Sequence, residues 1–114
     1  MAASFDSEKA MLDRLERDPE EPAASLSGNP TMHYAEIEAG RADAGIWTCT
    51  VGAWDEDPQA ADEVAYITKG RLRLTPQDGD AFELAAGDLL YLPKGWTGRW
   101  EVLEDLAKVY VVMP

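Results

Sequence analysis

One glutamate and one lysine are the residues of this chain whose types and spacing most clearly predict chemistry. Alternation along an extended strand places Glu63 on the same face as Ile67, so an inward Ile67 carries the carboxylate inward as well. A buried carboxylate needs a cation, and Lys108 is the expected partner. The pair either acts catalytically, binding a substrate and moving protons, or only fixes the register of two strands.

Aromatic residues around such a pair predict a small-molecule pocket, although core filling explains them equally well. The chain has four tryptophans. We expect Trp100 and Tyr110 to face the pocket, Trp96 to lie at its mouth and Trp47 to fill the core. Lys94 is expected at the rim, where it either meets an anionic ligand or is simply solvated.

Metal ligands of the usual kinds are scarce, because the chain has one histidine, His33, and one cysteine, Cys49. A single cysteine excludes an internal disulfide and a thiolate zinc cluster, and Cys49 is expected to be a small buried hydrophobic residue. An acidic loop either offers oxygen ligands to calcium or magnesium or is only solvated, and its members are Asp55, Glu56, Asp57 and Asp62. We expect no metal ion and no cofactor.

These side chains must be positioned mainly by β-strands. From residue 33 onward, short apolar or alternating runs separated by turn residues predict an all-β fold with strands over residues 33–37, 46–53, 63–68, 71–75, 81–84, 89–92, 97–103 and 108–112. Lys69-Gly70 is expected to be a tight turn. Residues 5–18 suit a short amphipathic helix and residues 18–30 an extended connection. The chain therefore divides into an N-terminal segment, residues 1–30, and a barrel, residues 31–114.

Two spacings in the predicted barrel resemble the motifs of the cupin family. Glu63 is followed after six residues by Gly70, and Gly87 is followed after five residues by Pro93 and then by Gly95. With residues 45–52, 93–102 and 108–110, they resemble the short single-domain cupins of the uncharacterised type 3 group. That group is similar to the cupin domains of ethanolamine utilisation protein Q and of ureidoglycine aminohydrolase. The resemblance implies a double-stranded β-helix, the cupin jelly-roll barrel, and a homodimer.

The same resemblance exposes a difference from metal-using cupins. Those proteins place two histidines before the glutamate and one in the second motif, and together these residues hold a transition metal. The corresponding positions here are Asp57 and Gln59, or with a longer spacing Glu56 and Pro58, and then Gly98. Glu63 alone is retained, and one carboxylate cannot supply the ligands that such metals prefer.

Composition limits the partners of the protein. With 22 acidic and 10 basic residues the net charge is −12, which repels nucleic acids and anionic membrane surfaces. The acidity either keeps the protein soluble or steers cationic ligands. The first ten residues lack the pattern of a secretory signal, so we expect a cytoplasmic protein. The predicted function is metal-independent binding or conversion of a small molecule in the barrel. The alternative is a non-catalytic oligomeric module with a vestigial pocket.

Overall fold

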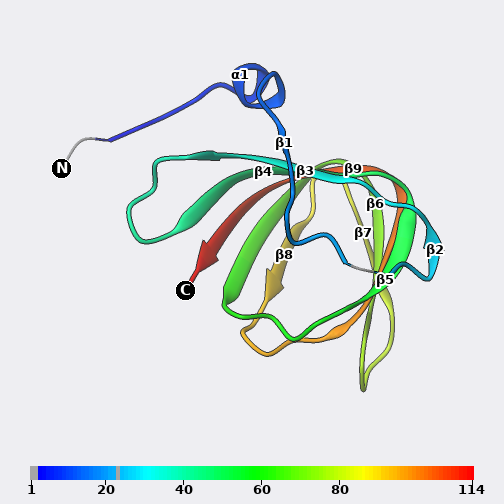
Figure 1. Ribbon diagram of the computed structural model, residues 1–114. Coiled ribbons are helices and arrows are strands. Elements are labelled where there is room, and N and C mark those ends of the chain that lie inside the picture. Colours follow the sequence, from blue (N-terminus) through cyan, green and yellow to red (C-terminus); the bar gives the residue numbers. More distant parts are fainter. Residues whose placement is uncertain (1–2, 23) are drawn as a thin grey trace.

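Two long strands, β6 (Asp62–Pro76) and β9 (Gly98–Met113), pair antiparallel along nearly their whole length and form the centre of the structure. The structure is a computed structural model that describes residues 3–22 and 24–114. The remaining strands flank this central pair and curl around one interior, as the jelly-roll prediction requires (Figure 1). The all-β fold with one short helix predicted from the sequence is confirmed.

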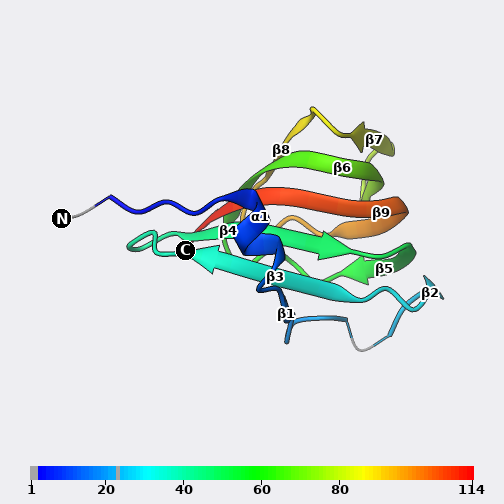
Figure 2. The same cartoon turned by 90° about the horizontal axis from the view of Figure 1, so that it is seen from above.

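The flanking strands attach to different halves of the central pair. The half of β9 near the C-terminus pairs with β4 (Asp43–Cys49), and the other half pairs with β5 (Gly52–Glu56). Beyond β4 lies β3 (Met32–Ile37). On its other side β6 pairs with β7 (Phe82–Ala85) and with β8 (Leu89–Leu92). Figure 2 shows this order of strands, from β7 and β8 through β6, β9 and β4 to β3.

Gly70 bends β6 and does not reverse it, so the predicted tight turn at Lys69-Gly70 is wrong. The register between β6 and β9 shifts at this point, and Gly70 adopts a φ of 86°. A Cβ at Gly70 would lie 2.2 Å from the carbonyl oxygen of Asp105, so the two backbones approach too closely for a side chain. Because β9 is also continuous here, both halves of β6 keep a partner and the chain forms a bulge.

The N-terminal segment contributes more than a helix. The helix α1 (Glu8–Leu12) is capped by Ser7, and the prediction of helix as far as residue 18 is wrong. The chain turns to extended backbone because β1 (Glu16–Arg17) pairs with β3. Farther on, β2 (Ser27–Gly28) pairs with β5, within the predicted extended connection. These two short strands therefore lie at opposite ends of the strand order β1-β3-β4-β9-β5-β2.

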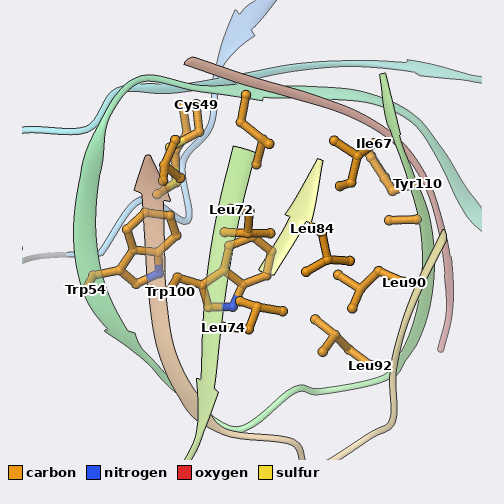
Figure 3. Packing of buried hydrophobic residues seen from close by; sticks show 14 residues of the cluster. Cys49, Trp54, Ile67, Leu72, Leu74, Leu84, Leu90, Leu92, Trp100 and Tyr110 are labelled. Atoms are coloured by element: carbon orange, nitrogen blue, oxygen red, sulfur yellow. The ribbon is translucent and has the colours of Figure 1, made fainter. Parts of the chain in front are cut away.

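The core extends through the inside of the barrel and is most tightly packed around the first half of β9. Leu72 and Leu74 are fully buried there and pack with Leu84, Val102 and the stacked rings of Trp54 and Trp100 (Figure 3). A smaller cluster lies on the outer surface, where Met11 of α1 packs on Ala35 and Ile46. The first cluster continues along β6, β8 and β9, and two polar residues, Glu63 and Lys108, are buried beside it.

Candidate functional site

A cavity of about 540 Å³ borders the core, and Met32, Trp54, Trp100 and Tyr110 belong to both. Its walls are inward side chains of β3, β4, β5, β6 and β9, and residues 18–22 close one side. That segment is anchored to β3, where the Asp18 backbone N–H donates to the carbonyl of Met32 and the Met32 N–H donates to the Glu21 carboxylate at 2.9 Å. The cavity is therefore built jointly by the barrel and the N-terminal connection.

Glu63 and Lys108 meet inside this cavity. The Lys108 ammonium donates to Glu63 Oε2 at 2.6 Å, and the two residues are only 6% and 8% exposed. Lys108 lies opposite Ile67 in the register, four residues along β6 from Glu63, so its long side chain runs along the barrel to reach the carboxylate. Gln59 Nε2 lies 3.5 Å from the other carboxylate oxygen. The contact predicted from strand alternation is present, whereas its role in chemistry stays a prediction.

Two indole rings complete the surroundings of the Lys108 ammonium. Its nitrogen lies 4.6 Å from the ring centre of Trp47 and 4.9 Å from that of Trp100, distances at which a cation is attracted to the ring face. Trp47 packs edge-on against Trp100, which stacks on Trp54. Trp47 packs against the core as predicted, and its partly exposed ring also lines the cavity, which was not predicted.

Aromatic donors orient the other carboxylates of the cavity. Trp47 Nε1 donates to Asp18 at 3.0 Å, and Trp54 Nε1 donates to Glu56 at 2.6 Å. Burial raises the pKa of Glu56, and the Trp54 hydrogen bond and the positive charge of Lys108 oppose this shift. Glu56 thus has its charge disfavoured by burial while its hydrogen-bond partner is neutral.

A glycine on β4, Gly45, lies between Tyr110 and Glu36 and leaves room for their hydrogen bond. Glu36, Gly45 and Tyr110 are in register on three neighbouring strands, and the Tyr110 hydroxyl reaches across the glycine to donate to Glu36 at 2.8 Å. A Cβ at Gly45 would lie 2.0 Å from the carbonyl oxygen of Ala35, so only glycine fits. Burial, followed by the bond to Glu36, raises the pKa of Tyr110, so the hydroxyl keeps its proton.

The turn residues predicted for the pocket lie elsewhere. Lys94 is exposed, and its backbone N–H donates to Asp62 at 2.8 Å. The ring of Trp96 packs against the core, and neither residue lines the cavity. Of the predicted site residues, the structure therefore brings Glu63, Lys108, Trp100 and Tyr110 together around one cavity.

Sequence reasoning missed several carboxylates of the cavity wall, namely Asp18, Glu20, Glu36 and Asp43, and it placed Glu56 only in an acidic loop. Alternation with Tyr34 could have identified Glu36, because both point inward from β3. Asp18 carries no such signal, since its place depends on the path of the connection between β1 and β2. Cys49 is buried as predicted, and burial raises its pKa to about 12.

The residues do not fit the metal site of metal-using cupins. Glu63, the retained ligand, is bound by the Lys108 ammonium. A side chain at Gly98 has no room, because its Cβ would lie 2.3 Å from the carbonyl oxygen of Thr75 and 2.9 Å from the Trp96 ring. Within residues 3–22 and 24–114, no three His, Cys, Asp or Glu side chains form a group that could hold a metal ion.

A family model described as the EutQ-like cupin domain matches residues 36–110, which hold most of the barrel and cavity. The chain belongs to this cupin family. The match covers the strands that carry Glu63 and Lys108, and it ends at Tyr110. The type 3 cupin resemblance predicted from the motifs is confirmed.

Solved cupin structures share the fold. Ethanolamine utilization protein Q from Salmonella typhimurium superposes with a TM-score of 0.65 at 18% identity, over 74% of this chain and 70% of that one. A Thermotoga maritima protein from a domain family of unknown function is 35% identical over 60% of this chain and 76% of that one, with a TM-score of 0.57. A Pseudomonas syringae protein of unknown function gives a TM-score of 0.77 at 21% identity, over 88% and 44%. No curated protein matches the chain.

The described residues contain no helix of sufficient length and apolar character to cross a membrane.

Proposed function

We propose that the cavity binds a small organic molecule without a metal ion and that Glu63 and Lys108 contact its polar part. The observation that carries this proposal is a buried ion pair on the wall of a cavity, beside the packed core. Buried ion pairs stabilise a fold little compared with apolar side chains of similar volume, so a purely structural reason for the pair is weak. Polar groups enclosed by aromatic walls are typical of sites that orient small ligands.

The pair also offers a route for moving protons. Glu63 can accept a proton from a bound substrate, while Lys108 donates one to the product. Transfer of the proton from Glu63 to Lys108 across their 2.6 Å hydrogen bond then restores both groups. Trp100 and Tyr110 supply walls for the ligand, whereas Lys94 and Trp96 lie outside the cavity and take no part in this proposal.

A ligand screen with paired variants tests the proposal. Small amines, carboxylates, alcohols and ureides are screened by thermal shift, and compounds that raise the melting temperature are then titrated against Glu63→Gln. We expect the variant to lose at least about tenfold in affinity, equivalent to the loss of one charge-assisted contact. Lys94→Met, which removes an exposed charge outside the cavity, should bind as the unmodified protein does. Equal affinity in Glu63→Gln would contradict the role of the pair.

An exposed apolar surface on the barrel supports a second candidate, an oligomeric module. Its seven side chains lie outward on β8, β6 and β9 in matching register: Val64, Tyr66, Leu89, Tyr91, Val109, Val111 and Met113. They range from 37% to 71% exposed. Together they offer on the order of 700 Å², close to the roughly 800 Å² that each partner buries in a standard protein interface. We propose that a second copy of this chain covers this β8–β6–β9 face.

Oligomeric state tests this second candidate. Leu89→Lys combined with Tyr91→Glu places charges in the centre of the β8–β6–β9 face, so a dimer should dissociate to a monomer in light scattering after gel filtration. The control Phe82→Lys, an exposed apolar residue on β7 outside this face, should leave the dimer intact. A monomeric unmodified protein at micromolar concentration would refute the dimer. A dimer whose cavity binds no compound would instead favour a vestigial pocket.

A further inference from the structure

The side chains that line the cavity carry a strong excess of negative charge. Among the described residues, the lining includes six carboxylates and one basic side chain, Lys108; the carboxylates are Asp18, Glu20, Glu36, Asp43, Glu56 and Glu63. Lys108 is already paired with Glu63 at 2.6 Å. None of the other five carboxylates forms an ion pair with a described residue. An anionic ligand would therefore enter a field of its own sign.

Three of the hydrogen-bond donors on the cavity wall are already used, whereas the buried Trp100 Nε1 has no hydrogen-bond partner among the described residues. The indole N–H groups of Trp47 and Trp54 and the hydroxyl of Tyr110 each donate to one carboxylate. Each carboxylate has about four acceptor positions, so these bonds leave most of the acceptors free. Free acceptors therefore outnumber the free donor of Trp100 on this wall, which favours a ligand that brings donors of its own.

Two of the carboxylates stand next to each other at the open end. Glu36 pairs in register with Gly45, and Asp43 lies two residues before that glycine on the same face of β4. Diagonal neighbours on adjacent strands are about 7 Å apart, so the two negative charges lie within reach of one small ligand. Arg14 contacts Glu36 only through the backbone carbonyl. Asp43 forms no side-chain hydrogen bond with a described residue.

The positive charge that would balance these carboxylates is not supplied by a metal ion. No three of the acidic or other metal-ligating side chains in the described parts of the chain converge closely enough to hold one. The cavity of about 540 Å³ suits instead a small molecule whose charges are spread over several atoms. Its aromatic walls already accept the Lys108 ammonium at 4.6 and 4.9 Å, which demonstrates that this lining is compatible with an alkylammonium group.

From these observations we infer that the ligand is a small organic cation bearing primary ammonium or guanidinium groups, held by Glu36 and Asp43 at the open end of the cavity. The inference rests on the proposed function, because it names the chemical class of ligand for the same cavity. The N–H groups of the cation donate hydrogen bonds to the free carboxylate oxygens, and its alkyl part packs against the aromatic wall.

The inference is tested with probe molecules that all have four carbon atoms and differ in their charged or polar end groups. 1,4-Diaminobutane, butylamine, 1-butanol, butyrate and succinate are titrated at constant ionic strength into ¹⁵N-labelled protein. The indole N–H resonances report the place of binding, since Trp47 and Trp54 donate to cavity carboxylates, whereas Trp96 lies outside the cavity. We expect the two amines to move the Trp47 and Trp54 resonances with dissociation constants at least about tenfold below those of the other probes.

Isosteric variants then locate the cation. Glu36→Gln keeps an acceptor for the Tyr110 hydroxyl, and together with Asp43→Asn it should weaken 1,4-diaminobutane by about tenfold or more. Asp78→Asn combined with Asp80→Asn removes an equal charge from the exposed connection between β6 and β7 and should change nothing. Loss of affinity in this control equal to that in the cavity variant, or movement of the Trp96 resonance, would identify unspecific attraction to an acidic protein and overturn the inference.

The two proposals fail in different ways. Binding of butyrate or succinate in the cavity more tightly than the amines would leave the proposed function standing and overturn the cationic ligand. Cavity resonances that no probe moves at millimolar concentration would contradict both.

Discussion

Removal of the Lys108 charge is the sharpest perturbation of the buried pair. In Lys108→Met the Glu63 carboxylate, 8% exposed, loses its ammonium partner and keeps only the 3.5 Å contact with Gln59. Breaking a buried pair from one side costs about 3 kcal/mol of unfolding free energy. For a domain of this size the loss lowers the melting temperature by roughly 12 °C.

The converse variant should be milder. In Glu63→Gln the Lys108 ammonium keeps both indole faces and an amide oxygen as acceptor, so we expect a loss of about 1 to 2 kcal/mol. The double variant Lys108→Met with Glu63→Gln removes both charges. Its loss of unfolding free energy should be smaller than the sum of the losses in the single variants, with a coupling energy of at least about 2 kcal/mol.

Urea unfolding of the four proteins, followed by tryptophan fluorescence, measures this cycle. Lys94→Met serves as the control, because it removes an exposed lysine charge and should change stability by less than about 0.5 kcal/mol. The reasoning fails if Lys108→Met is no more destabilised than this control, or if Glu63→Gln costs more than Lys108→Met.

Three further predictions concern other parts of the structure. Gly70→Ala should destabilise by about 3 kcal/mol, because a Cβ would meet the Asp105 carbonyl at 2.2 Å; Gly87→Ala, with φ of 100° and nothing within 4 Å, should cost roughly 1 kcal/mol in the same urea assay. Glu56→Gln should stabilise the folded protein at pH 7, as urea unfolding measures. Burial raises the pKa of Glu56 in the folded state above its unfolded value, so the folded protein loses stability as the pH rises between these two pKa values. The stability gained in Glu56→Gln should therefore vanish below about pH 4. A gain that does not depend on pH would contradict this cause. Cys49, whose pKa burial raises to about 12, should resist iodoacetamide at pH 8 in the folded protein and react rapidly in urea, as measured by mass spectrometry.

Strand periodicity was sufficient to predict the central pair of the site. Glu63 and Lys108 lie on β6 and β9, the two strands that pair along the whole barrel, and their inward faces follow from buried neighbours two residues away. The family motifs supported the same orientation. The contact between the two groups therefore depended only on local alternation and on the strands being adjacent.

Features that depend on contacts between distant segments of the chain could not be predicted from local strand periodicity. Lys69-Gly70 suits a tight turn and a bulge equally well, and only the continuity of β9 opposite decides for the bulge. The helix ends early because Arg17 finds a partner in His33 on β3, a contact between segments that local periodicity does not describe. Trp47 could not be assigned to the cavity before the place of Asp18 was known.

The connection between β1 and β2 has a consequence for shortened forms of the protein. A chain that began at Thr31 would lack Asp18, and it would leave the outer edges of β3 and β5 without the short strands that pair with them. Exposed strand edges recruit strands from other molecules. Such a truncated protein should self-associate. The residues before Thr31 therefore cover two strand edges that would otherwise promote aggregation, and they also form part of the cavity wall.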